Sequence, residues 1–421
     1  MVILRTIIFF TSDFRFFKTL NGSKLHPPVN IHFFKVSIPS FHFFGAIGYF
    51  VGLIVGICIA HFTKLALWPL LLCGIIGAAV LFGLTYIYKK ITGKEDLVYY
   101  QHEIIILICC TIVLLLLNLP VLKYLDITLI GIGVFLAFGR IGCFSVGCCH
   151  GKPGKTGVIY TDDHVAEGFN RHFVGIPIFP IQLVESICVF VTVVIGSYFI
   201  LNNFLPGSTL LIYTIIYGAV RFILEYFRGD TERPYWMGFS EAQWTTLGIF
   251  VVSVILSLFN LLPHYIWHLS ALHVLVLFMI IITIVRKIRN TITFKLFQPK
   301  HILEIAKGIE TLERNSFQAN KILIFKTSEE LNISMGKTTT AENILIHYTL
   351  SINHSYKKNK KLMNKSLANK LGKLIKILRY FDNPFEISNE QTGIFHILFS
   401  LPVEKTGVEK IIGAAKLQPF L

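Results

Sequence analysis

Long apolar runs, separated by short polar connections, dominate the hydrophobic pattern of the chain. A transmembrane helix needs about 20 mostly apolar residues. Eight runs reach or nearly reach that length, near residues 41–60, 66–88, 103–121, 126–146, 181–202, 207–227, 243–262 and 266–285. The pattern predicts an all-α polytopic membrane protein, a bundle of seven to eight transmembrane helices.

The polar stretches define the remaining regions of the chain. Residues 1–40 carry charges every few positions and no cleavable signal-peptide pattern, so we expect them to lie along the membrane interface. The connection 147–180 is the longest between spans and mixes Gly, Pro, His and charged residues, which predicts a structured head region within the transmembrane domain 41–289. Residues 290–421 are rich in Lys and Asn with short β-like runs, which predicts a C-terminal soluble α/β domain.

One stretch of this C-terminal domain, "KSLANKLGKLIKILRYF", has apolar residues at helical spacing with lysines opposite. Leu371, Leu374, Ile375 and Leu378 form its apolar stripe. Such a helix can lie on an anionic lipid surface or pack on the core of its own domain. We favour the second interpretation.

Composition adds a strong positive charge to this picture. The 421 residues are 53% hydrophobic and carry a formal net charge of +15. In a membrane protein, this excess indicates basic cytoplasmic loops and contact with anionic lipid headgroups. We therefore expect membrane lipids, and no nucleic acid, as partners.

The sixth apolar run contains charges that are costly in a bilayer, at roughly 2.5 kcal/mol or more each. Arg221, Glu225 and Arg228 stand at i, i+4 and i+7, which places them on one face of a continuous helix. An internal Arg221–Glu225 ion pair is one explanation, but it leaves the second arginine without a partner. Arginine offers a planar fork of donors that matches phosphate, so we favour an anion-binding role.

Two neighbouring segments supply further polar residues. Gln182 and Glu185 lie one turn apart at the start of the fifth run, as a buried polar pair or as a helix cap. Arg140 ends the fourth run, where an arginine alone could reach the interface by snorkelling. Together with the two arginines of the sixth run, it forms a set suited to a phospholipid headgroup.

Cysteines follow Arg140 in "FGRIGCFSVGCCHG". Five of the eight cysteines lie within apolar runs and are interpreted as packing residues; the others are Cys143, Cys148 and Cys149. With His150 they could hold a soft metal, but C-x4-C-C-H is no standard finger and adjacent cysteines rarely share an ion. We therefore favour packing around a Gly-rich turn and predict no metal and no cofactor.

Four motifs in this order, "GRIGCFSVGCCHGKP", "FPIQLVE", "YGAVRFILEYFRGD" and "FSEAQW", resemble the prolipoprotein diacylglyceryl transferase family over roughly residues 40–262. The resemblance implies a seven-helix bundle in the bacterial plasma membrane, with a head region between its fourth and fifth helices. It also implies transfer of the diacylglyceryl group of phosphatidylglycerol to the lipobox cysteine of a prolipoprotein. A thioether forms, glycerol 1-phosphate leaves, and no cofactor is needed.

The resemblance also implies roles for individual residues. Arg140, Arg221 and Glu225 match catalytic positions, and Glu225, His150 and His102 are the candidates for the base that takes the thiol proton. The predicted substrate-binding residues, with glycines that let the backbone approach the headgroup, are Arg228, Gln182, Glu185, Gly139, Gly142, Gly147, Gly151 and Tyr217.

The chain departs from the family pattern at several polar positions. Cys143 and Val146 stand where the family has asparagine, and Cys148 where it has glutamate. Phe44 replaces a tyrosine, Phe179 replaces a histidine, and "VYYQHE" lacks the two glycines that follow the family's histidine. Alternative functions are therefore a non-catalytic phospholipid- or protein-binding relative and a thiol-metal or redox membrane protein.

Lysines and arginines are distributed unevenly between the two sides of an eight-span chain. One side has only Lys64 and Lys123; the other has Arg5, Arg15, Lys18, Lys24, Lys35, Lys89, Lys90, Lys94, Lys152, Lys155, Arg171, Arg228, Arg233, Arg286, Lys287 and Arg289. The positive-inside rule places both termini and the 147–180 connection in the cytoplasm. The resemblance implies a head region on the outer side, so the sequence leaves both orientations open.

Overall fold

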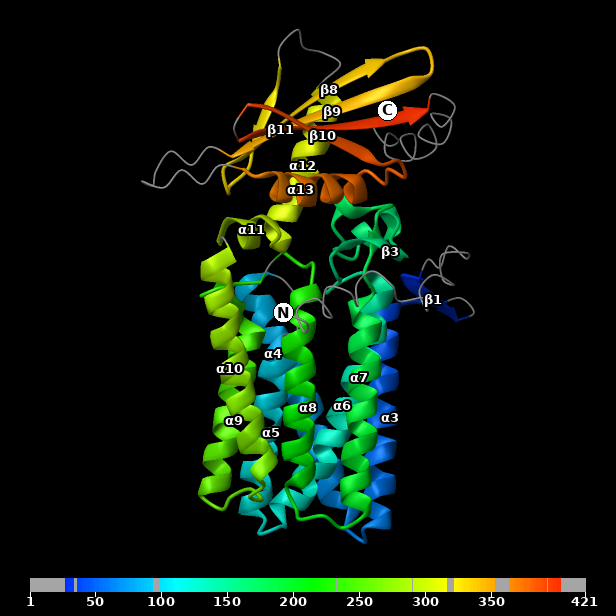
Figure 1. Ribbon diagram of the computed structural model, residues 1–421. Coiled ribbons are helices and arrows are strands. Elements are labelled where there is room, and N and C mark those ends of the chain that lie inside the picture. The colour runs from blue at the N-terminus through cyan, green and yellow to red at the C-terminus, as the bar shows by residue number, and fades with distance from the viewer. Residues whose placement is uncertain are drawn as a thin grey trace.

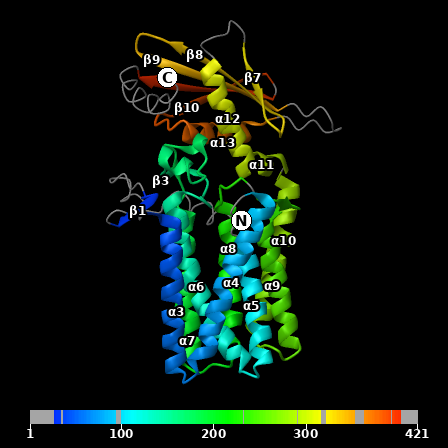
Figure 2. The same cartoon turned by 180° about the vertical axis from the view of Figure 1, so that it is seen from behind.

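The computed structural model describes residues 27–33, 36–93, 99–231, 233–289, 291–315, 322–352, 363–391 and 393–402. A bundle of long helices forms one part of the molecule, and a β-sheet with covering helices stands on one end of the bundle (Figure 1). Figure 2 shows the same two-part arrangement from behind. Most of the predicted interfacial segment 1–40 lies outside the described residues.

The bundle consists of α3 (Ser40–Phe62), α4 (Leu67–Thr92), α5 (Tyr99–Leu116), α6 (Val121–Val146), α7 (Ile181–Leu201), α8 (Ser208–Leu224), α9 (Glu241–Leu258) and α10 (Ile266–Arg289). Among the described residues, seven helices are long and apolar enough to cross a membrane, and α5 is a shorter apolar helix. Large apolar side chains such as Phe82 and Leu116 face outward, where lipid would cover them. The predicted polytopic helical bundle is confirmed.

Helix α6 forms the centre of the bundle. In the apolar stretch of α6, 67% of the residues are buried, whereas in that of α4 only 11% are buried. Small residues bring α3 close to α6, because a Cβ on Gly52 would lie 2.6 Å from the carbonyl oxygen of Gly131. Close backbone approach of this kind is how transmembrane helices gain van der Waals contact without a hydrophobic driving force.

Successive helices run in opposite directions, so alternate connections meet at one end of the bundle (Figure 1). This end, here called the head end, carries the hairpin of β1 (Asn30–Phe33) and β2 (Val36–Pro39) and the segments that follow α6, α8 and α10. Helix α9 begins there with a capping box in which the backbone N–H of Ser240 donates to Gln243 Oε1 at 3.0 Å. The motif "FSEAQW" is therefore a helix start.

The connection between α6 and α7 forms the predicted head region. It contains β3 (Pro153–Ile159), the 3-10 turns η2 (Asp162–Val165) and η3 (Arg171–Phe173), and β4 (Pro177–Ile178), with β3 and β4 antiparallel. The hydroxyl of Tyr160 donates to the carbonyl oxygen of Phe144 at 3.1 Å and ties this region to the end of α6.

Beyond α10 the chain forms α11 (Thr291–Leu296), α12 (Pro299–Asn315), α13 (Lys365–Leu378) and an antiparallel five-stranded sheet. The strands, in the order β10-β11-β9-β8-β7, are β7 (Ile324–Lys326), β8 (Leu331–Thr339), β9 (Asn343–Ile352), β10 (Phe385–Gln391) and β11 (Ile394–Pro402). This C-terminal unit confirms the predicted mixture of helices and strands.

Helix α13 packs its apolar stripe inward, with Leu371, Leu374, Ile375 and Leu378 all buried. The interpretation as a surface helix of its own domain is confirmed, and the lipid-facing alternative is wrong, because that stripe is already covered. Residues of the head region and of the C-terminal unit share one hydrophobic core, and His172 Nδ1 lies 2.6 Å from Glu310 Oε2 across the junction. The domain boundary after residue 289 therefore stays a prediction.

Candidate active site

A buried carboxylate, Glu185 of α7, lies at the head end of the bundle and is surrounded by cations. Its Oε2 is 3.2 Å from Arg140 Nε of α6 and 3.6 Å from Arg228 Nη1. Its Oε1 is 3.8 Å from Arg221 Nε of α8 and accepts a hydrogen bond from the Tyr217 hydroxyl at 3.1 Å. Four predicted site residues, from α6, α8 and the segment after α8, thus meet at Glu185, and its interpretation as a helix cap is wrong.

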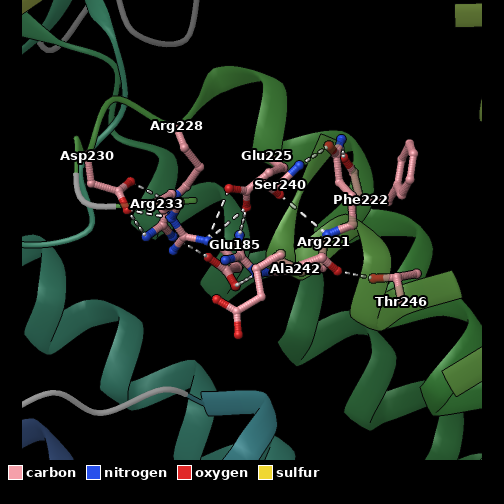
Figure 3. A network of polar contacts seen from close by, with 12 residues as sticks. Glu185, Arg221, Phe222, Glu225, Arg228, Asp230, Arg233, Ser240, Ala242 and Thr246 are labelled. Carbon is pink, nitrogen blue, oxygen red and sulfur yellow. Dashed lines mark hydrogen bonds and ion pairs between the residues drawn. The ribbon is translucent and has the colours of Figure 1, made fainter. Parts of the chain in front are cut away.

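A second layer of charge extends this arrangement toward the head end (Figure 3). Glu225 lies 3.0 Å from Arg221 Nη1 on one side and 3.0 Å from Arg233 Nη1 on the other. Asp230 accepts hydrogen bonds from Arg228 Nε at 2.8 Å and from Arg233 Nε. We name the whole set, Arg140, Arg221, Arg228, Arg233, Glu185, Glu225 and Asp230, the arginine cluster.

The expectation of one continuous helical face through Arg228 is wrong. Helix α8 ends at Leu224, Glu225 lies in the 3-10 turn η4 (Glu225–Phe227), and Arg228 is extended with φ −67° and ψ 141°. The chain leaves the helix to pair with the segment after α6, since Gly229 N donates to the carbonyl oxygen of His150 at 2.8 Å. A Cβ on Gly229 would lie 2.2 Å from the Gly151 carbonyl oxygen, so this approach requires glycine.

The expectation that a second arginine lacks a partner is also wrong, since every guanidinium of the arginine cluster has an acidic neighbour. Among the described residues, four arginines face three carboxylates, so the arginine cluster keeps an excess of positive charge. Arg140 Nε, Arg221 Nη1 and Arg228 Nη1 are buried within ion-pair distance but make no hydrogen bond there. A buried donor without a hydrogen bond is costly, and such donors are what an anion with several oxygens can satisfy.

Charge also determines the protonation of groups at the edge of the arginine cluster. Burial raises the pKa of Asp230, but the charges of Arg228 and Arg233 outweigh burial and hold that pKa well below its usual range. Burial lowers the pKa of Lys152 to about 8, against the opposing attraction of Glu225. Lys152 therefore adds a titratable positive charge beside Glu225.

The predicted glycines have structural reasons for their close contacts. Gly142 packs on the backbone of Phe41, because a Cβ on Gly142 would lie 3.1 Å from the Cα of Phe41. Gly151 packs on the carbonyl oxygen of Phe179. Gly147 has φ 78° and ends α6 in a left-handed turn. These three glycines let segments of the chain itself approach each other, while a Cβ on Gly139 would meet open space.

Gln182 and His150 connect the arginine cluster to the head region. Gln182 Nε2 donates to the carbonyl oxygen of Cys148 at 2.8 Å. His150 Nδ1 lies 2.8 Å from the carbonyl oxygen of Gly151, so Nδ1 carries the proton and Nε2 keeps its lone pair. Burial lowers the pKa of His150, which favours the neutral ring.

His102 lies elsewhere in the bundle. It lines an apolar pocket between α3, α4, α5 and α6 together with Glu103 and Cys73. The residue of α5 that contacts the site is Tyr100, whose ring centroid is 5.9 Å from that of Tyr217. Tyr100 also shares a hydrogen bond with Thr246 of α9 through their hydroxyls at 3.3 Å.

Sequence reasoning missed Asp230 and Arg233 as members of the site. Both follow the sixth apolar run in "FRGDTERP", and Arg233 counted only as a charge that bears on orientation. The alternating positive and negative charges after the sixth apolar run were the available signal for a folded, paired segment. Arg228, Asp230 and Arg233 can neutralise one another only if the chain turns back after the helix.

Comparison with known proteins relates this site to a family. The model of the prolipoprotein diacylglyceryl transferase family matches residues 28–259, more than half of the chain. The chain belongs to this family. Every residue of the arginine cluster lies inside the matched range, whereas α10 and the C-terminal unit lie beyond it.

Curated relatives carry the name phosphatidylglycerol–prolipoprotein diacylglyceryl transferase. One from Clostridium tetani is 35% identical over 144 residues, 32% of this chain and 55% of the relative. A second from Clostridium perfringens is 30% identical over 138 residues, 32% of this chain and 51% of the relative, and one from Dehalococcoides mccartyi is 32% identical over 140 residues with the same shares. The chain spans about half the length of the curated relatives it matches, and no solved structure matches it.

Proposed function

We propose that this family member transfers the diacylglyceryl group of phosphatidylglycerol to the thiol of a lipobox cysteine in a prolipoprotein, in a bacterial plasma membrane. The observation that carries the proposal is the arginine cluster, a buried set of guanidiniums with excess positive charge and ion-paired donors that make no hydrogen bond, at the end of an apolar bundle. A phospholipid has matching parts, because its acyl chains suit the bilayer and its phosphate suits arginine forks.

In the proposed transfer reaction, the largest change of charge occurs on the phosphate of the lipid. The acceptor sulfur attacks the glyceryl carbon, the bond from that carbon to the phosphate oxygen breaks, and glycerol 1-phosphate leaves with the electron pair. Donors fixed in a water-poor site stabilise such a developing charge more than water does. Arg140, Arg221 and Arg228 are in position to do this, with Glu185 as the positioning residue that holds all three.

Of the candidate bases, the geometry supports His150 best. Its Nε2 keeps a lone pair, whereas the Glu225 carboxylate is engaged by Arg221 and Arg233. His102 lies in the apolar pocket between α3 and α6. A base must come within hydrogen-bond reach of the acceptor thiol, and His150 is tied to the segment that carries Arg228 by the hydrogen bond from Gly229 N to its carbonyl oxygen.

The test is transfer from labelled phosphatidylglycerol to a lipobox peptide by the purified protein and its Arg221→Ala variant. Removing one such donor typically lowers turnover about 100- to 1,000-fold. Arg171→Ala is the matched control, because Arg171 is an exposed arginine of the head region. Loss of Arg221 leaves buried carboxylates uncompensated, so Arg221→Ala could lower activity by unfolding the protein. Thermal melting of each variant measures folding. Arg221→Lys keeps the positive charge and so tests the guanidinium in a folded protein.

A non-catalytic phospholipid-binding relative is the second candidate, favoured by the replacement of polar family positions by Cys143, Val146 and Cys148. It expects phosphatidylglycerol to bind in an Arg221-dependent way without transfer to the peptide. If the folded protein neither transfers nor binds the lipid, the headgroup role of Arg140 and Arg221 is wrong.

A further inference from the structure

Three thiols from a stretch of seven residues meet beside the arginine cluster. The Sγ atoms of Cys143, Cys148 and Cys149 all lie within 4.8 Å of one another. Cys143 belongs to the last turn of α6, and the left-handed turn at Gly147 brings the next two cysteines back toward it. None of the three forms a disulfide.

The backbone conformation of Cys149 is unusual for a residue that only fills space. Cys149 has φ 53°, in the left-handed region that residues with a Cβ rarely adopt. Strained conformations of this kind persist where the surroundings hold them and cluster at functional sites. Here the strain places a third sulfur beside two others, an arrangement that packing does not require.

Positive charge and a fixed turn surround the three thiols. The guanidiniums of Arg140 and Arg228 are near enough to act electrostatically on Cys149. Gln182 holds the Cys148 carbonyl oxygen and so fixes the turn from the adjacent helix α7. Metal sites depend on outer partners of this kind, which orient the ligands and tune their charge.

We propose that Cys143, Cys148 and Cys149 bind one Zn²⁺ ion and leave a fourth coordination position open. Zn–S bonds of about 2.3 Å place ligand sulfurs roughly 3.8–4.0 Å apart, so each sulfur has to move by less than about 1 Å. Three protein ligands with an open position are typical of catalytic zinc, and four of structural zinc. His150 is not a fourth ligand in this arrangement, because neither of its ring nitrogens lies within the group formed by the three sulfurs.

Resting on the proposed transferase function, the open position would bind the thiol of the acceptor cysteine. A thiol bound to zinc loses its proton, in this arrangement to water and without the need for His150 as a base, and becomes a thiolate at neutral pH. Its sulfur then forms the bond to the glyceryl carbon while the carbon–oxygen bond breaks and the electron pair leaves with the phosphate. A zinc ion held by the three cysteines would thus take the place of the polar side chains that the family has at positions 143 and 148.

The first experiment measures metal in the full-length protein purified in detergent. We expect one zinc ion per chain, and after exchange to Co²⁺ a sulfur-to-cobalt charge-transfer absorption. Cys143→Ser, Cys148→Ser and Cys149→Ser should each weaken zinc binding by more than the roughly 10- to 100-fold that outer partners contribute. Cys109→Ser is the matched control, because Cys109 lies within α5 and outside the three-thiol set. Zinc binding that is equal in all four variants would overturn the site.

A second measurement needs no variant and so does not depend on the folding of one. Zinc should protect Cys143, Cys148 and Cys149 from alkylation by iodoacetamide, read by mass spectrometry of the peptides, while the exposed Cys58 reacts equally with and without the metal. Equal alkylation of the three thiols in the presence and absence of zinc would overturn the proposal.

The transfer assay separates this inference from the proposed function. Transfer that is lost on chelation and restored by zinc supports both. Transfer that survives in metal-free protein overturns the catalytic zinc and leaves the transferase proposal standing. Zinc bound by the three thiols without any transfer supports the metal site and overturns the transferase proposal.

Discussion

The two ends of the helix bundle each contain a buried carboxylate, and the two are held in opposite ways. At the end away from the head region, Asp126 of α6 accepts two backbone N–H groups at the start of α8, from Gly207 at 2.7 Å and Leu210 at 2.8 Å. At the head end, Glu185 lies among Arg140, Arg221 and Arg228.

The difference separates structural from functional charge. Asp126 saturates the free donors of a helix N-terminus, and this satisfied cap leaves nothing for a ligand. The arginine cluster keeps excess charge and buried donors without hydrogen bonds, which is what the proposed phosphate would satisfy. A buried charge therefore indicates a binding site when its neighbours over-compensate it.

The largest expected effect is on the activity of reporter proteins fused to the chain, because a reporter is active on only one side of the membrane. It shows which side each end of the bundle faces. At the head end, Lys89 and Lys90 lie in the last turn of α4, Lys155 lies in β3 and Lys287 lies near the end of α10; at the other end, Lys64 follows α3 and Lys123 lies in the first turn of α6. We expect the head end in the cytoplasm, so green fluorescent protein fused to the C-terminus should fluoresce and alkaline phosphatase should be inactive. An active phosphatase fusion would place the head end outside. The predicted charges at positions 1–26, Lys35 and Lys94 lie outside the described residues.

The next largest effect is expected from Glu185→Gln. The substitution removes the charge that three guanidiniums share, so we expect at least about 100-fold slower transfer and a loss of about 3–5 kcal/mol in the free energy of unfolding. Transfer assays and thermal melting in detergent measure the two quantities. Transfer within twofold of the parent would show that Glu185 does not position the arginines.

Asp126→Asn is the matched change at the opposite end. Its amide can accept from only one of the two backbone donors, so we expect a loss of about 2 kcal/mol in the free energy of unfolding. Turnover per folded molecule should stay unchanged. A large loss of turnover in folded Asp126→Asn protein would show that the two ends are coupled and that the comparison above fails.

The smallest expected effect is the pH dependence of phosphatidylglycerol binding. Because the pKa of Lys152 is about 8, the charged form dominates below that pH and is lost above it. Lipid affinity should therefore fall as pH rises through about 8, by roughly fivefold, equivalent to about 1 kcal/mol. Lys152→Arg should remove this step, since arginine stays charged; a step that persists in Lys152→Arg must come from another group.

Local patterns predicted much of the fold and the identity of many site residues. Hydropathy located the helices of the bundle, and helical spacing located the buried stripe of α13. The motif residues Arg140, Glu185, Tyr217 and Arg221 do meet in space. These successes share a cause, because hydrophobic length and periodicity are properties of a single segment.

The pairing of charges could not be predicted in this way. Arg228 leaves the helix because the segment at Gly151 and Gly229 pairs there, an interaction between residues far apart in the sequence. Asp230 and Arg233 complete the arginine cluster for the same reason. His102, although named by the motif, lies in a different pocket because helix packing directs its side chain there.

The sequence by itself determined that this is a polytopic membrane protein of the prolipoprotein diacylglyceryl transferase family, since apolar length and motif order are written along the chain. Only the tertiary structure decided which carboxylate holds which arginine, that α8 stops before Arg228, and that three thiols share one place. Those outcomes depend on distances between segments, which the packing of helices around α6 sets and no single segment encodes.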